Sequence, residues 1–158
     1  MFKLDQTDKK LLTLLQTDSK QTNKELSNKL NLSVTAIYER VKKLEKEGVI
    51  KNYVALLNRK QVEKSFMAHC HVRLTQHSKE YVIKFEREIK KLEEVLECYH
   101  ISGDYDYILK VLVKDMEAYR DFMVTKLTAI PNIGNTHSIF VIDEVKHTTS
   151  EYTVLYQF

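Results

Sequence analysis

Two carboxylates stand close together in the stretch HISGDYDYILKV (residues 100–111), where Asp104 and Asp106 flank Tyr105 just after Gly103. No lysine or arginine follows them until Lys110. Glycine tolerates positive φ and aspartate bonds its own backbone, so the stretch suits a tight hairpin turn. Two carboxylates without a neighbouring cation are equally suited to one side of a binding site. The stretch alone leaves both interpretations open.

A second stretch whose side chains could take part in chemistry is HCH at residues 69–71. Imidazole and thiolate are both ligands of transition metals. The surrounding residues are strand-forming, and in a strand His69 and His71 share one face while Cys70 points to the other. We therefore interpret the histidines as a surface or interface pair, and predict neither a metal site nor a cofactor.

Catalytic signatures are missing from the sequence. It has no Ser/His/Asp order, no glycine-rich phosphate loop and no HExxH motif. Cys70 and Cys98 match no metal or redox spacing. The sequence also lacks an apolar run of the roughly 20 residues that span a membrane, and its start lacks the apolar core of a signal peptide. We predict a cytoplasmic protein that is neither an enzyme nor bound to a membrane.

The charge of the chain is unevenly distributed. With 43% apolar and 30% charged residues, the 158-residue chain has an ordinary globular composition. Residues 1–60 carry 13 Lys/Arg and 7 Asp/Glu, whereas residues 61–158 carry 12 and 15. A basic segment favours polyanionic partners. The two halves are therefore expected to have different roles.

Three short helices are predicted in the first half from their caps and apolar spacing. The first begins at Asp5, the second opens with a capping box of Thr22 and Glu25, and the third starts at Ser33. Gly48 ends the third helix. Their inner faces are formed by Leu11, Leu12, Leu15, Leu26, Leu30, Ile37, Val41 and Leu44.

Only the residues NLS (31–33) separate the second helix from the third, which is the spacing of a helix-turn-helix. The following residues 49–58 are suitable for a strand or wing. In the third helix, hydrogen-bonding groups face outward near the start and cations follow. Recognition helices read bases with their first turns and hold phosphates with the rest.

We therefore predict base-edge contacts from Thr35, Tyr38 and Glu39, and phosphate contacts from Lys42, Lys43, Lys46 and Lys51. Arg40 lies at the flank, where it could reach a phosphate or pair with a carboxylate inside the domain. A solvated surface balanced by Glu45 and Glu47 is the alternative interpretation.

From residue 66 onward, strands and helices alternate. Strand-forming stretches cover residues 66–75, 95–102, 105–113 and 136–146, and helix-forming stretches cover residues 78–94 and 115–130. All three glycines, Gly48, Gly103 and Gly134, fall at predicted turns. The order βαββαβ predicts an α+β domain with an antiparallel sheet and both helices on one face.

Both halves resemble the Lrp/AsnC (feast/famine) family of regulators. The matching stretches are LDQTDKKLLTLLQTDSK (4–20), ELSNKLNLS (25–33), RVKKLEKEGVI (40–50), SGDYDYIL (102–109) and NTHSIFVI (135–142). The resemblance implies a winged helix-turn-helix over residues 1–50, a linker strand or hinge over residues 51–65, and a ferredoxin-like effector (RAM) domain over residues 66–158. It also implies double-stranded DNA as a partner, homodimers through the effector-domain sheets that assemble into tetramers or octamers, and a bacterial or archaeal protein associated with the nucleoid.

In this family the Gly-x-x-Asp turn lies between dimers and helps to form the effector pocket. A carboxylate can hold the ammonium group of an amino acid, and backbone N–H groups at a glycine turn can face its carboxylate. Two hydroxyls on one face of the last strand could add contacts. The resemblance thus implies that an amino acid or related metabolite binds to Gly103, Asp104, Tyr105, Asp106, Thr136 and Ser138.

The function predicted is that of a sequence-specific transcriptional regulator modulated by a small effector. Two alternatives remain open. One is an architectural DNA-binding protein without an effector, in which the turn only shapes a hairpin. The other is an enzyme, because sirohaem decarboxylases resemble these regulators in both halves; such an enzyme would use histidines of the set His69, His71, His100 and His137.

Overall fold

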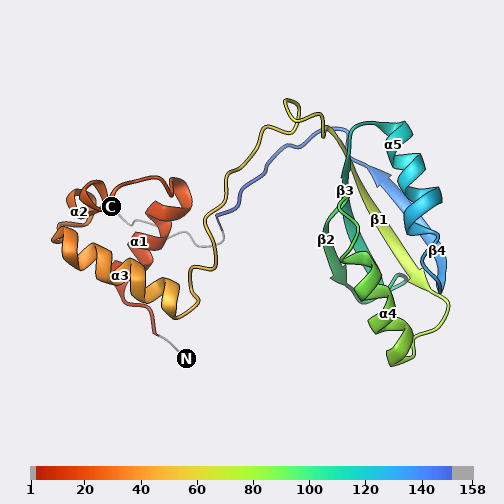
Figure 1. The fold of residues 1–158 in the computed structure, drawn as a ribbon, viewed down its shortest axis with the longest axis horizontal. Coiled ribbons are helices and arrows are strands. Elements are labelled where there is room, and N and C mark those ends of the chain that lie inside the picture. The colour runs from red at the N-terminus through yellow and green to blue at the C-terminus, as the bar shows by residue number, and fades with distance from the viewer. Residues whose placement is uncertain (1–2, 151–158) are drawn as a thin grey trace. The chain divides into compact units, whose positions relative to one another are not determined.

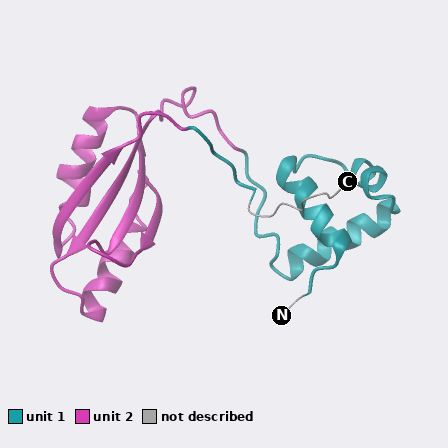
Figure 2. Cartoon of the chain, turned by 180° about the vertical axis from the view of Figure 1, so that it is seen from behind, with its two compact units in different colours: residues 1–55, 145–158 teal, residues 56–144 magenta. Residues whose placement is uncertain are grey.

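The computed structural model describes residues 3–150. The chain forms two compact units, one of residues 1–55 and 145–158 and the other of residues 56–144 (Figure 2). The expected domain boundaries, residues 1–50 and 66–158 with a linker between them, stay a prediction. Within the first unit, Gln16 Nε2 donates a hydrogen bond of 3.3 Å to the carbonyl oxygen of Thr149. Residues 145–150 therefore group with the first helices of the chain.

The first unit contains three helices, α1 (Gln6–Thr17), α2 (Asn23–Leu30) and α3 (Val34–Lys46) (Figure 1). Their caps are those expected. The Asp5 side chain accepts from the backbone N–H of Asp8 at the start of α1, and Thr22 and Glu25 form the capping box of α2. Asn31 adopts the left-handed conformation at the end of α2, which makes the short turn into α3 possible.

The interior of the first unit is a small leucine-rich core. Leu11, Leu26, Ile37 and Leu44 are almost fully buried, one or two from each helix. Around them pack the partly buried residues Leu4, Leu12, Leu14, Leu15, Leu30, Leu32, Val41 and Ile50. The inner face predicted for α3 is thereby confirmed, and the opposite face of the helix remains exposed.

The expected strand at residues 49–58 is absent. Residues 51–65 form neither helix nor strand, so of the two expected forms of this linker the strand is not observed, and its role as a hinge stays a prediction. A strand needs a neighbouring strand to pair its backbone N–H and C=O groups. Within residues 3–150 the sheet contains four other strands and does not include this segment.

The second unit has the predicted order βαββαβ. Its elements are β1 (Phe66–Leu74), α4 (Lys79–Ile89), β2 (Val95–His100), β3 (Tyr107–Val113), α5 (Met116–Asp121), the π-helix η1 (Phe122–Leu127) and β4 (Ile133–Phe140). The sheet order is β2-β3-β1-β4, and all neighbouring pairs are antiparallel. The α+β fold class is confirmed.

The helices α4 and α5 cover one face of the sheet (Figure 1). Ala68, Cys70, Val72 and Leu74 alternate along β1 toward these helices and are fully or nearly fully buried. Because side chains alternate across a strand, His69 and His71 lie on the opposite face. No helix of residues 3–150 covers this side of the sheet, which is called the open face below. Its other strands place Tyr99, Lys110, His137 and Ile139 there.

Candidate functional site

The outer face of α3 is exposed as the sequence predicted. Thr35, Tyr38, Glu39, Lys42, Lys43 and Lys46 are all exposed, and Lys51 follows as another exposed cation. The Lys42 ammonium lies 5.9 Å from the ring centroid of Tyr38 and 3.7 Å from a carboxylate oxygen of Glu45. The helix thus presents a hydroxyl and a phenol near its start and amines further along.

A cavity of about 690 Å³ runs beside these lysines and is lined by Lys3, Asp5, Asp8, Glu39, Arg40, Lys42, Lys43, Lys46 and Glu47. Its walls carry both charges, because four lysines and Arg40 line it together with four carboxylates. The cavity brings Lys3 beside the amines predicted to bind phosphate, a residue that the sequence reasoning did not single out. Lys3 belongs to the basic first part of the chain, and this position could have indicated that it contributes to phosphate binding.

Arg40 takes the second of its two expected roles. Its Nη1 donates to Asp5 Oδ2 and to Asp8 Oδ1, each at 2.7 Å. The Asp8 side chain is only 9% exposed, whereas that of Arg40 is 31% exposed. Hydrogen bonding to Asp5 and Asp8 raises the pKa of the Arg40 guanidinium. The backbone N–H of Asp8, together with Arg40, lowers the pKa of Asp5.

In the second unit, Asp106 fixes the turn from the inside. Its Oδ2 accepts from the backbone N–H of Leu74 at 2.7 Å, and its Oδ1 lies 2.9 Å from His77 Nε2. Burial raises the pKa of the Asp106 carboxyl, but the Leu74 N–H and His77 outweigh burial and leave the pKa lowered. Gly103 has a φ of +121°, a conformation that glycine adopts without strain.

Tyr105 lies on the open face with two histidines. Its ring centroid is 5.4 Å from that of His71 and 6.2 Å from that of His137. Arg73 reaches over it, with Cζ 5.6 Å from the ring centroid, and donates from Nε to the Asp104 carbonyl oxygen at 2.5 Å. The Asp104 side chain itself is 96% exposed.

The two predicted hydroxyls lie on the helix-covered side. The Ser138 hydroxyl is 2.6 Å from the Tyr119 hydroxyl and 4.0 Å from the thiol of the buried Cys70. Thr136 is two residues before Ser138 in β4 and therefore points to the same side. Three of the six predicted effector residues thus have different partners: Tyr105 lies with the histidines, Asp106 with Leu74 and His77, and Ser138 with Tyr119.

Arg73 and His77 contact the turn but were missed by the sequence reasoning. A signal was available. Because β1 pairs antiparallel with β3, the residues at the end of β1 must lie beside those just before β3. Within residues 3–150, no group of three or more His, Cys, Asp or Glu side chains is arranged to hold a metal ion. None of the helices in this part of the chain is long and apolar enough to cross a membrane.

Comparison with known families decides the relationship. Residues 4–51 match the model of winged helix-turn-helix DNA-binding domains, and residues 67–151 match the model of the Lrp/AsnC ligand binding domain. The chain belongs to the Lrp/AsnC family. Like its relatives in the Lrp/AsnC family, it is a DNA-binding transcriptional regulator.

Individual relatives cover almost the whole chain. The leucine-responsive regulatory proteins of Escherichia coli and Salmonella typhimurium are 38% identical over 145 residues, which is 92% of this chain and 88% of theirs. A transcriptional regulator from Neisseria meningitidis, solved as a complex with L-Met, superposes with a TM-score of 0.90 at 35% identity, covering 94% of this chain and 96% of its own. An AsnC family regulator from Agrobacterium tumefaciens gives a TM-score of 0.89 at 36% identity, covering 92% and 95%.

Proposed function

We propose that this Lrp/AsnC family regulator binds specific DNA sites as a dimer or a multiple of it, and that an amino acid modulates its assembly or its DNA binding. The observation that carries the DNA part is the exposed face of α3, whose polar groups precede its amines. In such helices the first turns contact base edges and the remainder contacts phosphates. We assign base contacts to Thr35, Tyr38 and Glu39, and phosphate contacts to Lys42, Lys43, Lys46 and Lys51.

Arg40 has a different place in this proposal. Its guanidinium joins the start of α1 to the middle of α3 through Asp5 and Asp8. We assign it the role of a positioning residue, which holds the angle of α3 against α1. Any contact of Arg40 with a phosphate would come from the nitrogens that do not bond these carboxylates.

The effector is proposed to bind beside the turn of residues 103–106. Support comes from the L-Met bound to the Neisseria meningitidis relative and from the exposed groups at this turn. Asp104 offers an accessible carboxylate, since its side chain is 96% exposed and its one ion pair, with Arg73 Nη2 at 4.0 Å, is long. Asp106 acts from behind, where its bonds to Leu74 and His77 fix the turn. The Ser138 and Thr136 hydroxyls would have an indirect role, in which they help to hold β4 against the side of the domain where Tyr119 lies.

A specific observation favours the effector-independent alternative. Both carboxylate oxygens of Asp106 already have partners within the unit, Leu74 and His77. These two contacts are also expected if Asp106 only stabilises the hairpin and binds no effector. A test of amino-acid binding therefore separates the two functions.

For the oligomer, the open face is the proposed dimer interface. It exposes Tyr99 and Ile139, 56% and 47% respectively, beside His69 and His71. Large apolar side chains on an uncovered sheet are better buried against a partner. Further assembly into tetramers or octamers would bring the turns of neighbouring dimers together, and such a regulator would reside on the nucleoid.

The DNA part is tested by the salt dependence of binding. Two recognition helices of a dimer require half-sites about one helical turn apart, so a selected palindromic duplex serves as the ligand. Lys46→Ala should lower the slope of the logarithm of the DNA-binding constant against the logarithm of the salt concentration by about one. It should also weaken binding to all DNA sequences to the same extent. Thr35→Ala should leave the slope unchanged but relax sequence preference. Equal slopes for the wild type and Lys46→Ala, measured by fluorescence anisotropy, would contradict the assignment.

A further inference from the structure

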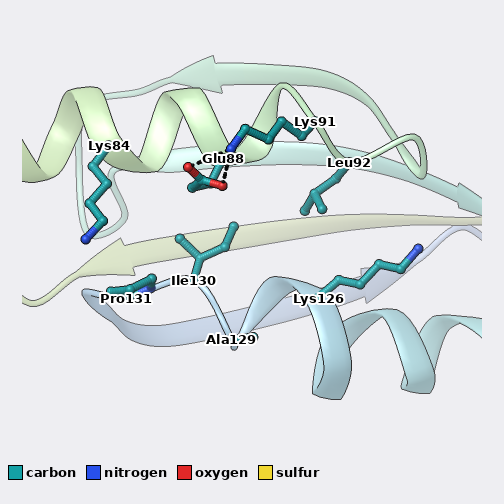
Figure 3. Close-up of a pocket in the computed structure, with 8 residues that line it drawn as sticks. All are labelled: Lys84, Glu88, Lys91, Leu92, Lys126, Ala129, Ile130 and Pro131. Carbon is teal, nitrogen blue, oxygen red and sulfur yellow. Dashed lines mark hydrogen bonds and ion pairs between the residues drawn. The ribbon is translucent and has the colours of Figure 1, made fainter.

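A second cavity, of about 300 Å³, lies on the helix-covered side of the second unit (Figure 3). One wall comes from α4 and the residues just after it, and the other comes from the end of η1 and the residues just after it. The groove shares no lining residue with the turn of residues 103–106. Its lining residues are Lys84, Glu88, Lys91, Leu92, Lys126, Ala129, Ile130 and Pro131. This volume is at the small end of the roughly 300–1,000 Å³ found for ligand pockets.

The walls of the groove are chemically divided. Leu92, Ala129, Ile130 and Pro131 form an apolar side, and the remaining lining residues carry charges. Figure 3 shows the Lys84 side chain extending from α4 toward the part of the groove where Pro131 lies. An apolar wall with few polar groups suits a small ligand with one charged end.

The charges of the groove are not equivalent. The Lys91 ammonium is 2.7 Å from a carboxylate oxygen of Glu88, and the Lys126 ammonium is 2.5 Å from Glu94. Lys84 is exposed, and its ammonium group has neither a hydrogen bond nor an ion pair with any residue of the range 3–150. One amine next to the apolar wall thus remains without a counter-charge.

The backbone next to the groove is unusual. Residues Phe122–Leu127 form a π-helix, and the N–H of Thr128 bonds to the carbonyl oxygen of Met123 at 3.0 Å, five residues back. Isolated π turns within helices occur often at functional sites. This one leads directly into residues 129–131, which form the apolar wall.

We propose that this groove binds a small aliphatic monocarboxylate, with its carboxylate on the Lys84 ammonium and its tail against Ile130 and Pro131. An α-keto acid with a branched tail has this form.

The test is isothermal titration of the full-length protein with α-ketoisocaproate, the keto acid of leucine. Binding by the wild type is expected, with a loss of about ten-fold or more in Lys84→Gln, because a charge-assisted hydrogen bond is removed. Ala129→Phe should block the groove, since this alanine is exposed and lines it. Lys79→Gln, at an exposed lysine of the same helix outside the groove, is the matched control and should bind like the wild type.

Absence of binding by the wild type, or binding by Lys84→Gln and Ala129→Phe as tight as by the wild type, would overturn the proposal. Asp106→Ala separates it from the proposed effector turn. This variant should still bind α-ketoisocaproate with wild-type affinity, whether or not the turn responds to amino acids. Loss of keto-acid binding in Asp106→Ala with full binding in Lys84→Gln would assign the ligand to the turn instead.

Discussion

Arg40 is the residue on which the geometry of the DNA-binding unit depends most. A single nitrogen, Nη1, bonds two carboxylates at the start of α1, and one of these, Asp8, is nearly buried. Removal of the guanidinium leaves the Asp8 carboxylate without its cation. A buried charged group that loses its partner is destabilising.

Arg40→Ala is therefore expected to lower the free energy of unfolding by about 2 kcal/mol. Urea denaturation at fixed protein concentration measures the change. Lys42→Ala is the matched control on the same helix, because Lys42 is exposed and should change stability by less than about 0.5 kcal/mol. Equal effects of the two substitutions would show that the Arg40 bonds do not contribute to stability.

Asp106 gives a prediction about pH. Its folded-state pKa lies below the ordinary value of 3.8, so its ionised form is favoured in the folded protein. This contribution to stability is present above the unfolded-state pKa and is lost as the pH falls through the folded-state pKa. The free energy of unfolding of the wild type should therefore fall more steeply from about pH 5 to about pH 2 than that of Asp106→Asn. Parallel curves in urea denaturation would contradict the bonds to Leu74 and His77.

At the scale of elements, the helices of the first unit were predictable because their signals are local. Thr22 and Glu25 satisfy each other's backbone N–H groups within four residues, and Ser33 caps α3 through the Ala36 N–H. Such contacts depend only on neighbouring side chains. The expected helix ends at Asp5 and Gly48 lie within one or two residues of the observed ends.

The last helix and the last strand were less predictable. The expected helix 115–130 is divided into α5 and η1, where the hydroxyls of Thr125 and Thr128 bond back to the carbonyl oxygens of Asp121 and Met123; side-chain bonds of this kind bend helices. The expected strand 136–146 is shifted to Ile133–Phe140 because its range is set by pairing with β1, from Leu74 to Ala68. The division of the helix depends on side-chain hydroxyls that compete for backbone carbonyl groups, and the shift of the strand depends on pairing with β1. Neither effect can be read from the local pattern of apolar residues.

The proposed dimer interface on the open face of the sheet can be tested by substitution. Ile139 is 47% exposed on the open face and Ile83 is 53% exposed on α4, on the other side of the sheet. If dimers form through the open face, Ile139→Asp should shift the protein toward monomers in sedimentation experiments, because a charge would be buried in the interface. Ile83→Asp is the control and should leave the assembly unchanged. Dissociation by Ile83→Asp alone would place the interface on the helix-covered side.

For the whole molecule, the family and the DNA-binding role could be predicted from the sequence because both halves carry their signatures. The contacts of the predicted effector residues could be predicted only in part, and their role in effector binding stays a prediction. The turn lies where expected, but Tyr105, Asp106 and Ser138 take different partners, and these partners come from β1, from the loop after it and from α5. Contacts at such sequence separations follow from the packing of the domain, which one sequence does not display.

The most direct test of the account is a thermal-shift measurement of the full-length protein with each common amino acid, L-methionine included. A ligand that binds only the folded state stabilises it by RT ln(1 + [L]/Kd), about 2.7 kcal/mol at a hundred-fold excess over Kd. We expect one amino acid, or a small group of them, to raise the melting temperature, and Asp106→Ala to abolish the shift. No shift with any amino acid, or an equal shift in the variant, would contradict an effector site at this turn.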